Sequence, residues 1–252
     1  MFQGFYNLTS GVLTQNRNLN VISNNMANTT TPGYKKDETT ITTFHDTLIS
    51  RVGNKEKQDA QVIGSSSSIV TVGQVATDYE AGDYEQTSNP MAFALGEKGF
   101  FCIQTNSGTV YTRNGNFSID EQGYLSLPEI GRVLGENGPI YLGTDKIKAD
   151  RAGVIRTEDG RQVLGKLSIV DFADRDTQLI KEDNGVFRAT GAIEQVNDAE
   201  VYWKTVESSN VKPVDEMIKM MSSQRNLQSD LQMIKIYDQL IGKMVSSLGP
   251  TQ

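Results

Sequence analysis

The chain has 252 residues, enough for one large domain or two small ones with a buried core. Charged residues make up 22% of the chain. The net charge of -7 argues against a nucleic-acid partner, because proteins that bind nucleic acid are usually basic. No apolar run approaches the roughly 20 residues of a membrane helix, and the single cysteine, Cys102, excludes an internal disulfide.

Residues 1–34 are rich in amides, carry few charges and predict an N-terminal helix. Its apolar residues recur at alternating steps of three and four, the spacing of a heptad seam. The seam comprises Phe5, Leu8, Val12, Leu19, Ile22 and Met26, with Gln15 in the remaining position. Uncharged polar faces can pack against another subunit without burying an unpaired ion. We therefore expect an assembly surface, while an ordinary amphipathic helix on the chain's own core is the open alternative.

This helix is expected to stop where Pro32 forces Thr31 out of helical geometry and Gly33 permits a turn. Amides near a helix end can cap it or bond to neighbouring backbone. The amides in question are Asn24, Asn25 and Asn28. We expect this stretch to redirect the chain toward an outer domain, although a purely local helix stop explains the same residues.

Residues 35–75 are expected to form an extended linker, and the polar stretch 53–68 an exposed loop. Residues 76–210 alternate short apolar runs with glycine or Asn-Gly turns, the pattern of an antiparallel barrel or sandwich. Cys102 lies in one of these apolar runs and is expected to be buried as a small hydrophobe. Trp203 is expected to serve packing.

Residues from 211 onward predict a long C-terminal helix, capped by Ser209 and Asn210 and ended by Gly249-Pro250. Residues 214–248 would make a rod of about 50 Å at 1.5 Å per residue. The predicted seam, polar members included, is Met217, Met220, Gln224, Leu227, Leu231, Ile234, Asp238, Ile241, Val245 and Leu248. A second stripe of Val214, Ile218 and Met221 widens the apolar face.

The expected fold class is α+β, with long N- and C-terminal helices paired like a coiled coil and a central, mostly antiparallel β domain. Residues 1–34 and 211–252 are assigned to a discontinuous helical assembly domain, 35–75 to the linker and 76–210 to the outer β domain. Two helices alone leave apolar and amide surface uncovered. We therefore expect both ends to be mobile in a monomer and to become ordered on association.

Four stretches now carry a family resemblance. The stretch LNVISNNMANTTTPGYKKDE at 19–38 and the stretch VESSNVKPVDEMIKMMSSQR at 206–225 resemble the two signatures of bacterial flagellar basal-body rod and hook proteins. Residues 95–125, with GFF and YTRNGNF, and residues 165–190 are similar to that family's central strands. The matching terminal positions are Ile22, Asn24, Asn25, Ala27, Asn28, Thr31, Pro32, Gly33, Tyr34, Glu207, Ser209, Asn210, Val211, Met220, Gln224 and Arg225.

Two positions depart from the family pattern. Lys204 stands where related chains often carry glycine, and Leu227 stands where many carry an aromatic residue. The length is short for a hook protein, which favours a rod subunit.

The resemblance implies a subunit that polymerises helically into a hollow drive shaft, which transmits torque to the hook and forms part of the export channel. The paired helices would line the inner tube, with the β domain outside. The implied partners are copies of itself, other rod subunits, the hook protein and the flagellar export apparatus. Export to the basal body would proceed without a cleaved signal peptide, because the first residues lack a basic region followed by an apolar one.

Other function classes have less support in the residues. His45 is the only histidine, no nucleophile motif accompanies it, and no His/Cys cluster suggests a metal. Asp171, Asp174 and Asp176 do not fit a calcium loop and suggest a solvated acidic turn. No enzyme activity, cofactor or metal is expected. The alternative function is an envelope-associated binding module with a coiled-coil stalk and no rod assembly.

Overall fold

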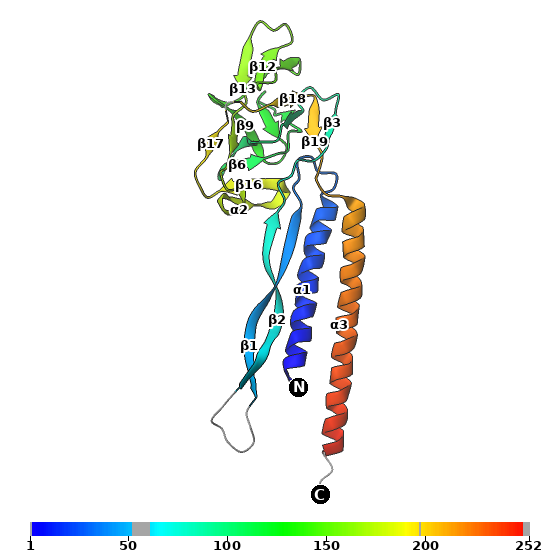
Figure 1. The fold of residues 1–252 in the computed structure, drawn as a ribbon. Helices are drawn as coiled ribbons and strands as arrows, with labels where there is room; N and C mark the ends of the chain where they lie inside the picture. The colour runs from blue at the N-terminus through cyan, green and yellow to red at the C-terminus, as the bar shows by residue number, and fades with distance from the viewer. Residues whose placement is uncertain (1, 52–60, 197, 249–252) are drawn as a thin grey trace. The chain divides into compact units, whose positions relative to one another are not determined.

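The computed structural model describes residues 2–51, 61–196 and 198–248, and the chain divides into two compact units (Figure 1). Unit 1 consists of residues 1–26, 37–76 and 213–252, and unit 2 of residues 27–36 and 77–212. The chain therefore passes between the units at four points, which flank the segments 27–36 and 77–212. In this division residues 37–75 of the expected linker 35–75 belong with the two helices.

Unit 1 contains two long helices, α1 (Phe2–Ala27) and α3 (Pro213–Leu248), and the paired strands β1 (Asp37–Arg51) and β2 (Gln61–Thr77). The structure has two paired strands in the region where a linker was expected. Their many Thr, Val and Ile residues favour strand geometry. Residues 53–60 of the expected loop lie outside the described residues, as does the Gly249-Pro250 stop, and residues 61–68 of that loop lie in β2 instead. Among the residues described, no helix has both the length and the apolar content that a membrane crossing requires.

The two helices of unit 1 lie side by side and antiparallel (Figure 1). They approach each other at four levels, each seven residues apart on both helices. The facing pairs are Gly4–Tyr237, Gly11–Asp230, Asn18–Ser223 and Asn25–Glu216. Glycine permits the close approach, because a Cβ at Gly4 would lie 2.7 Å from Oη of Tyr237.

Unit 2 is built from short antiparallel strands. Within the described residues its largest sheet has ten strands, in the order β15-β16-β6-β5-β9-β8-β7, with β10, β14 and β17 joined to it. Their bounds are β5 (Phe100–Thr105), β6 (Gly108–Thr112), β7 (Ser118–Ile119), β8 (Leu125–Leu127), β9 (Gly131–Gly135), β10 (Gly138–Pro139), β14 (Ile169–Asp171), β15 (Leu179–Lys181), β16 (Val186–Ala189) and β17 (Glu194–Gln195).

Smaller sheets complete the unit. Strands β11 (Ile147–Ala149), β12 (Val154–Thr157) and β13 (Val163–Lys166) form a three-stranded sheet. Strand β18 (Val201–Trp203) pairs with β4 (Phe93–Leu95), and β19 (Thr205–Glu207) pairs with β3 (Tyr84–Gln86). The short helix α2 (Arg175–Gln178) and the 3-10 turn Asp183–Gly185 precede β15 and β16. The α+β fold with terminal helices and a central antiparallel β domain is confirmed.

The core of unit 2 is apolar and closed. Phe93, Phe101 and Ile103 are fully buried in one cluster, and a second cluster gathers around Phe100 and Cys102. Burial of Cys102 is confirmed, and desolvation raises the pKa of its thiol to about 11. Such a thiol stays protonated at neutral pH and behaves as a small apolar group.

Trp203 packs against the first cluster and donates from Nε1 to the Pro90 carbonyl at 2.8 Å. The packing role expected of its ring is therefore confirmed.

Candidate assembly site

Asn25 is the most buried amide of the N-terminal signature, at 1% exposure. Its Oδ1 accepts from the Asp37 amide at 3.0 Å, and its Nδ2 donates to the Asp37 carbonyl at 2.8 Å. The same Nδ2 lies 3.4 Å from Oε2 of Glu216, whose Oε1 accepts from Lys219 at 2.8 Å. One amide side chain therefore joins the end of α1, the start of β1 and the first turn of α3, which explains why this position is polar but uncharged.

Residues 28–33 form a tight turn within unit 2. The Asn28 carbonyl accepts from the Thr31 amide at 3.2 Å, and Oδ1 of Asn28 accepts from the Thr31 hydroxyl at 3.2 Å. Gly33 has φ +68°, and a Cβ there would lie 2.3 Å from the carbonyl carbon of Arg113. Both the backbone angle and the close approach require glycine after Pro32.

Asn210 joins three segments of unit 2. Its Oδ1 accepts from the Lys36 amide at 2.7 Å, and its Nδ2 donates to the carbonyls of Asp78 and Glu80 at 2.9 and 3.2 Å. Its own amide donates to the Tyr34 carbonyl at 3.4 Å. These segments lie next to three of the points where the chain passes between the units. The predicted residue Asn210 thus holds the crossing segments together, in addition to lying before α3.

Glu207 is the centre of a buried ion cluster that the sequence analysis did not predict. Its carboxylate pairs with Lys35 and with Arg113, and it accepts from the Gly82 amide at 3.2 Å. Its backbone carbonyl accepts from the Gly33 amide at 2.7 Å. The three charged side chains are each at most 1% exposed.

The two cations of this cluster also bind backbone carbonyls. Nζ of Lys35 donates to Glu80 at 2.7 Å, and Arg113 donates to Gly96 at 2.7 Å and Glu97 at 2.8 Å. Desolvation lowers the pKa of both Lys35 and Arg113, and the Glu207 carboxylate opposes that shift. Each of the three charged residues lies in one of the stretches that resemble the family. Local sequence does not indicate that their side chains contact one another.

On α1 the predicted seam lies on covered or half-covered faces, except for Phe5, which is exposed. Ile22 is buried, and Leu8, Val12, Leu19 and Met26 are half-buried. Asn24 is exposed, in contrast to the adjacent Asn25.

On α3 the covered stripe shares Met220, Leu227 and Ile234 with the predicted seam but not its other described members. The stripe facing inward comprises Glu216, Met220, Ser223, Leu227, Asp230, Ile234 and Tyr237, and every second member is polar. The predicted seam residues Met217, Gln224, Leu231 and Ile241 are exposed, as is Arg225. The side chain of Val245 lies outside the described part of the chain.

The far side of α3 is apolar and exposed. The far side is defined by Val214, Ile218, Met221, Met233, Ile236 and Leu240, with exposures between 46% and 68%. At 100° per residue, Met233 and Leu240 project to the flank of the inward stripe, and the other four project opposite it. A helix that is apolar on two sides is typical of one that is covered by more than one neighbour.

The remaining predicted residues near α3 lie in unit 2. Ser209 Oγ accepts from the Val211 amide at 3.3 Å, and Val211 is buried. Tyr34 is buried and carries Nζ of Lys181 3.9 Å from its ring centroid. The predicted residues 33, 34 and 209–211 are thus brought together in unit 2.

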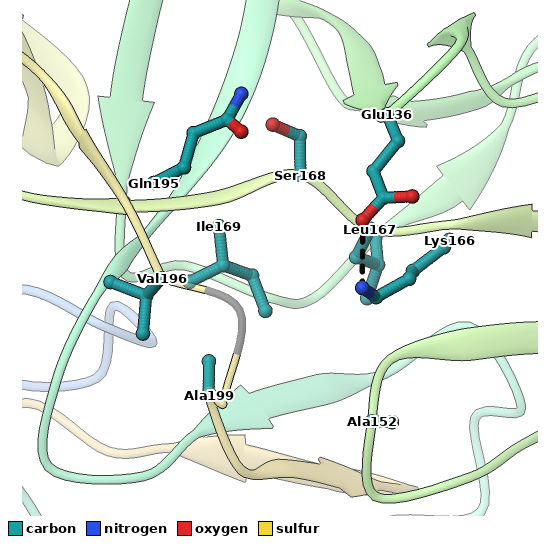
Figure 2. Close-up of a pocket in the computed structure, with 9 residues that line it drawn as sticks. All are labelled: Glu136, Ala152, Lys166, Leu167, Ser168, Ile169, Gln195, Val196 and Ala199. Carbon is teal, nitrogen blue, oxygen red and sulfur yellow. Dashed lines mark hydrogen bonds and ion pairs between the residues drawn. The ribbon is translucent and has the colours of Figure 1, made fainter.

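The pocket in Figure 2 does not resemble an active site. It offers about 20 Å³, room for roughly one water molecule. Lys166 and Glu136 form an ion pair of 2.7 Å at its wall, beside Ser168 and Gln195 (Figure 2). Over the described residues, no group of three His, Cys, Asp or Glu side chains could hold a metal ion.

Comparison with known proteins gives matches along most of the chain. Residues 5–35 match the family described as "Flagella basal body rod protein". Residues 94–144 match "Flagellar hook protein FlgE/F/G D1 domain", and residues 204–248 match "Flagellar basal body rod FlgEFG protein C-terminal".

Whole-length relatives agree with these partial matches. The flagellar basal-body rod protein FlgG of Bacillus subtilis is 28% identical, over 98% of this chain and 99% of the relative. FlgF of Caulobacter vibrioides is 28% identical over 94% of each chain. The flagellar hook-basal body complex protein FlhO of Bacillus subtilis is 25% identical over 99% of each.

Proposed function

The chain belongs to the flagellar basal-body rod protein family, and from that premise we propose that it polymerises helically as a structural subunit of the rod. Its partners are copies of itself, other rod subunits, the hook protein and the flagellar export apparatus. The polymer is a hollow shaft that transmits torque from motor to hook and forms part of the export channel. The subunit is exported to the basal body and has no enzyme activity.

The observation that carries this proposal is the second apolar side of α3. Ile236 and Leu240 are each about half exposed and lie outside the stripe that faces α1. Complete burial of such a side chain from water contributes about 1.5–3 kcal/mol, so covering the exposed half against a neighbour contributes roughly half of that each. A neighbouring subunit that offers its own helix surface would cover them without exposing new apolar area.

The pairing of α1 with α3 is coiled-coil-like. Contacts recur every seven residues on both helices, from Asn25–Glu216 to Gly4–Tyr237. A seven-residue repeat keeps the same faces of two supercoiled helices in contact. The contact positions are glycine, amide, hydroxyl and acid rather than leucine, so this pair is weaker than an apolar seam, and neighbours in the polymer add the missing burial.

The assembly surface therefore combines the predicted seam and signature residues of both helices. It includes the exposed predicted residues Met217, Gln224, Arg225, Leu231 and Ile241, together with the far side of α3. The helical ends are mobile in the monomer and ordered in the polymer. Hydrogen exchange measures this directly: amides of 2–20 and 230–248 exchange within seconds in a monomer and are protected in the polymer. Strong protection in the monomer contradicts this part of the proposal.

The test of rod assembly is self-association of the full chain. Purified protein at rising concentration is examined by light scattering and electron microscopy, and tubes or filaments of constant diameter are expected. A chain that binds envelope components but stays monomeric at every concentration supports the alternative of a coiled-coil binding module. Cell-wall hydrolysis by the pure chain would contradict the absence of enzyme activity.

A further inference from the structure

The buried cluster of Lys35, Glu207 and Arg113 carries two cations and one anion. Each member comes from a different matched region of the chain, and each is at most 1% exposed. Nε of Arg113 is buried and has no hydrogen-bond partner among the described residues. Burying an unbalanced and incompletely bonded set of charges is unfavourable, and apolar replacements of such sets are often as stable or more so. The cluster therefore needs an explanation other than stability.

Apolar burial within the β19–β3 pair does little to specify the register of the strand that carries Glu207. Strand β19 pairs with β3 through Thr205–Gln86, Val206–Glu85 and Glu207–Tyr84. The buried positions of β19 are Thr205 and Glu207, and all three residues of β3 are exposed. Register in a sheet is normally specified by apolar side chains that must face the core, and slippage is expected where they are absent.

The ion cluster supplies that specification. A slip of one residue would turn Glu207 to the opposite face of β19, because side chains alternate along a strand. Lys35 and Arg113 would then be buried without a counter-ion, and the Gly82 amide would lose its acceptor. A single register satisfies all three contacts.

We propose that the Lys35–Glu207–Arg113 cluster positions β19, and with it the residue at which α3 begins, for assembly of the rod. Only five residues lie between Glu207 and Pro213, the first residue of α3. The Gly33 amide on the Glu207 carbonyl ties the segment 33–36, which leads into β1, to the same register. The link to assembly rests on the proposed function, whereas the register itself does not.

The test compares disulfide yields between β19 and β3 in the full chain under mild oxidation. The correct register brings Val206→Cys opposite Glu85→Cys, and a slipped register brings it opposite Tyr84→Cys. With the cluster intact, only the 206–85 pair is expected to crosslink. Lys35→Met with Arg113→Met and Glu207→Gln removes the ion pairs, retains side-chain size and adds no apolar side chain to β19. We expect it to lower the ratio of 206–85 to 206–84 crosslinks about tenfold, since charged hydrogen bonds that favour one register are lost.

A second variant covers the case in which the triple variant does not fold. Glu207→Asp keeps the charge but shortens the side chain, and it is expected to lower the same ratio about threefold through weaker ion pairing. Arg188→Met is the matched control, because it removes an exposed ion pair with Glu182 in the same unit, and the ratio should stay unchanged. Unchanged ratios in every variant that folds overturn the proposal.

Assembly is then measured by sedimentation of the same proteins. A register-slipped variant is expected to form at least about tenfold less polymer than the parent, as expected when a misplaced α3 loses its contacts. Full assembly by the triple variant overturns the positioning role. A parent chain that never assembles contradicts the proposed function instead, and the crosslinking result still decides the register.

Discussion

The two units differ in what covers their apolar side chains. In unit 2, Phe93, Phe101 and Ile103 have no exposed area, and the chain's own strands surround them. In unit 1, Ile236 and Leu240 on α3 are half exposed although they are equally apolar. The core of unit 2 is thus covered by its own chain, whereas α3 of unit 1 leaves apolar side chains open to a partner, as the proposed rod assembly requires.

Polar groups show a related difference. Unit 2 buries three charges and satisfies most of their hydrogen-bonding atoms with its own backbone. Unit 1 buries the Glu216 carboxylate against Asn25, and other contacts between α1 and polar groups use amides, as where Asn18 donates to Ser223 at 2.9 Å and accepts from Thr39 at 2.8 Å. Amides adapt to neighbours without the desolvation cost of an ion, which suits a surface that must join several partners.

The largest expected effect is in the core of unit 2. Phe101→Ala removes a fully buried ring whose centroid lies 5.1 Å from the ring centroid of Phe117. The free energy of unfolding should therefore fall by about 3–5 kcal/mol. Urea unfolding followed by tryptophan fluorescence measures this change. Ile180→Ala, on an exposed edge strand, is the matched control and should change it by less than about 1 kcal/mol. Similar losses from both variants would break the comparison.

The next effect concerns the amide junction of unit 1. Asn25→Ala leaves both backbone groups of Asp37 and one oxygen of Glu216 without their partner, and should cost about 2–3 kcal/mol. Hydrogen exchange of the Asp37 amide is the readout. Asn20→Ala, at an exposed position of α1, should leave exchange unchanged. Protection of Asp37 that survives in Asn25→Ala contradicts the assigned role.

A smaller effect, of opposite sign, is expected at Lys204. This residue adopts φ +54°, a left-handed conformation that is unfavourable for a side chain with a Cβ. Lys204→Gly should raise the free energy of unfolding by about 1 kcal/mol, after the entropy cost of glycine is subtracted. Lys204→Ala keeps the strain and loses the contact with the Trp203 ring, so it should not stabilise. Thermal midpoints of the two variants distinguish these outcomes.

The smallest effect on stability is expected on the far side of α3. Ile236→Gln with Leu240→Gln should change the unfolding free energy of the monomer by less than about 1 kcal/mol, since both residues are half exposed and glutamine is a good helix former. Assembly measured by sedimentation should nevertheless be lost. Gln232→Ala with Gln239→Ala is the matched control and should assemble normally. Equal assembly by both double variants would contradict the idea that the apolar side chains of α3 in unit 1 serve assembly.

Much of the fold was predictable from local patterns. The helix–β–helix order, the burial of Cys102 and the turn after Pro32 follow from periodicity, apolar runs and glycine chemistry. The family resemblance also marked Lys204 as a departure from glycine, and its positive φ explains why glycine suits that position. These features depend on residues close together in the chain.

The inward stripe of α3 was predicted less well. The pattern indicated an apolar seam through Met217 and Leu231, but the stripe that faces α1 contains Glu216, Ser223 and Asp230. The reason is that α3 carries apolar residues on two sides. A prediction based on apolar residues alone selects the side that has more of them as the inward side. Polar contacts with Asn18 and Asn25 of α1 decide which side faces inward.

Sequence alone determined that the chain has two periodic helices around a β domain and that glycine must follow Pro32, because periodicity and backbone sterics act over a few neighbouring residues. Only the tertiary structure decided which side of α3 is covered, and that Lys35 meets Glu207 from 172 positions away. Local pattern defines the faces of an element, but the partner of each face depends on how distant segments pack.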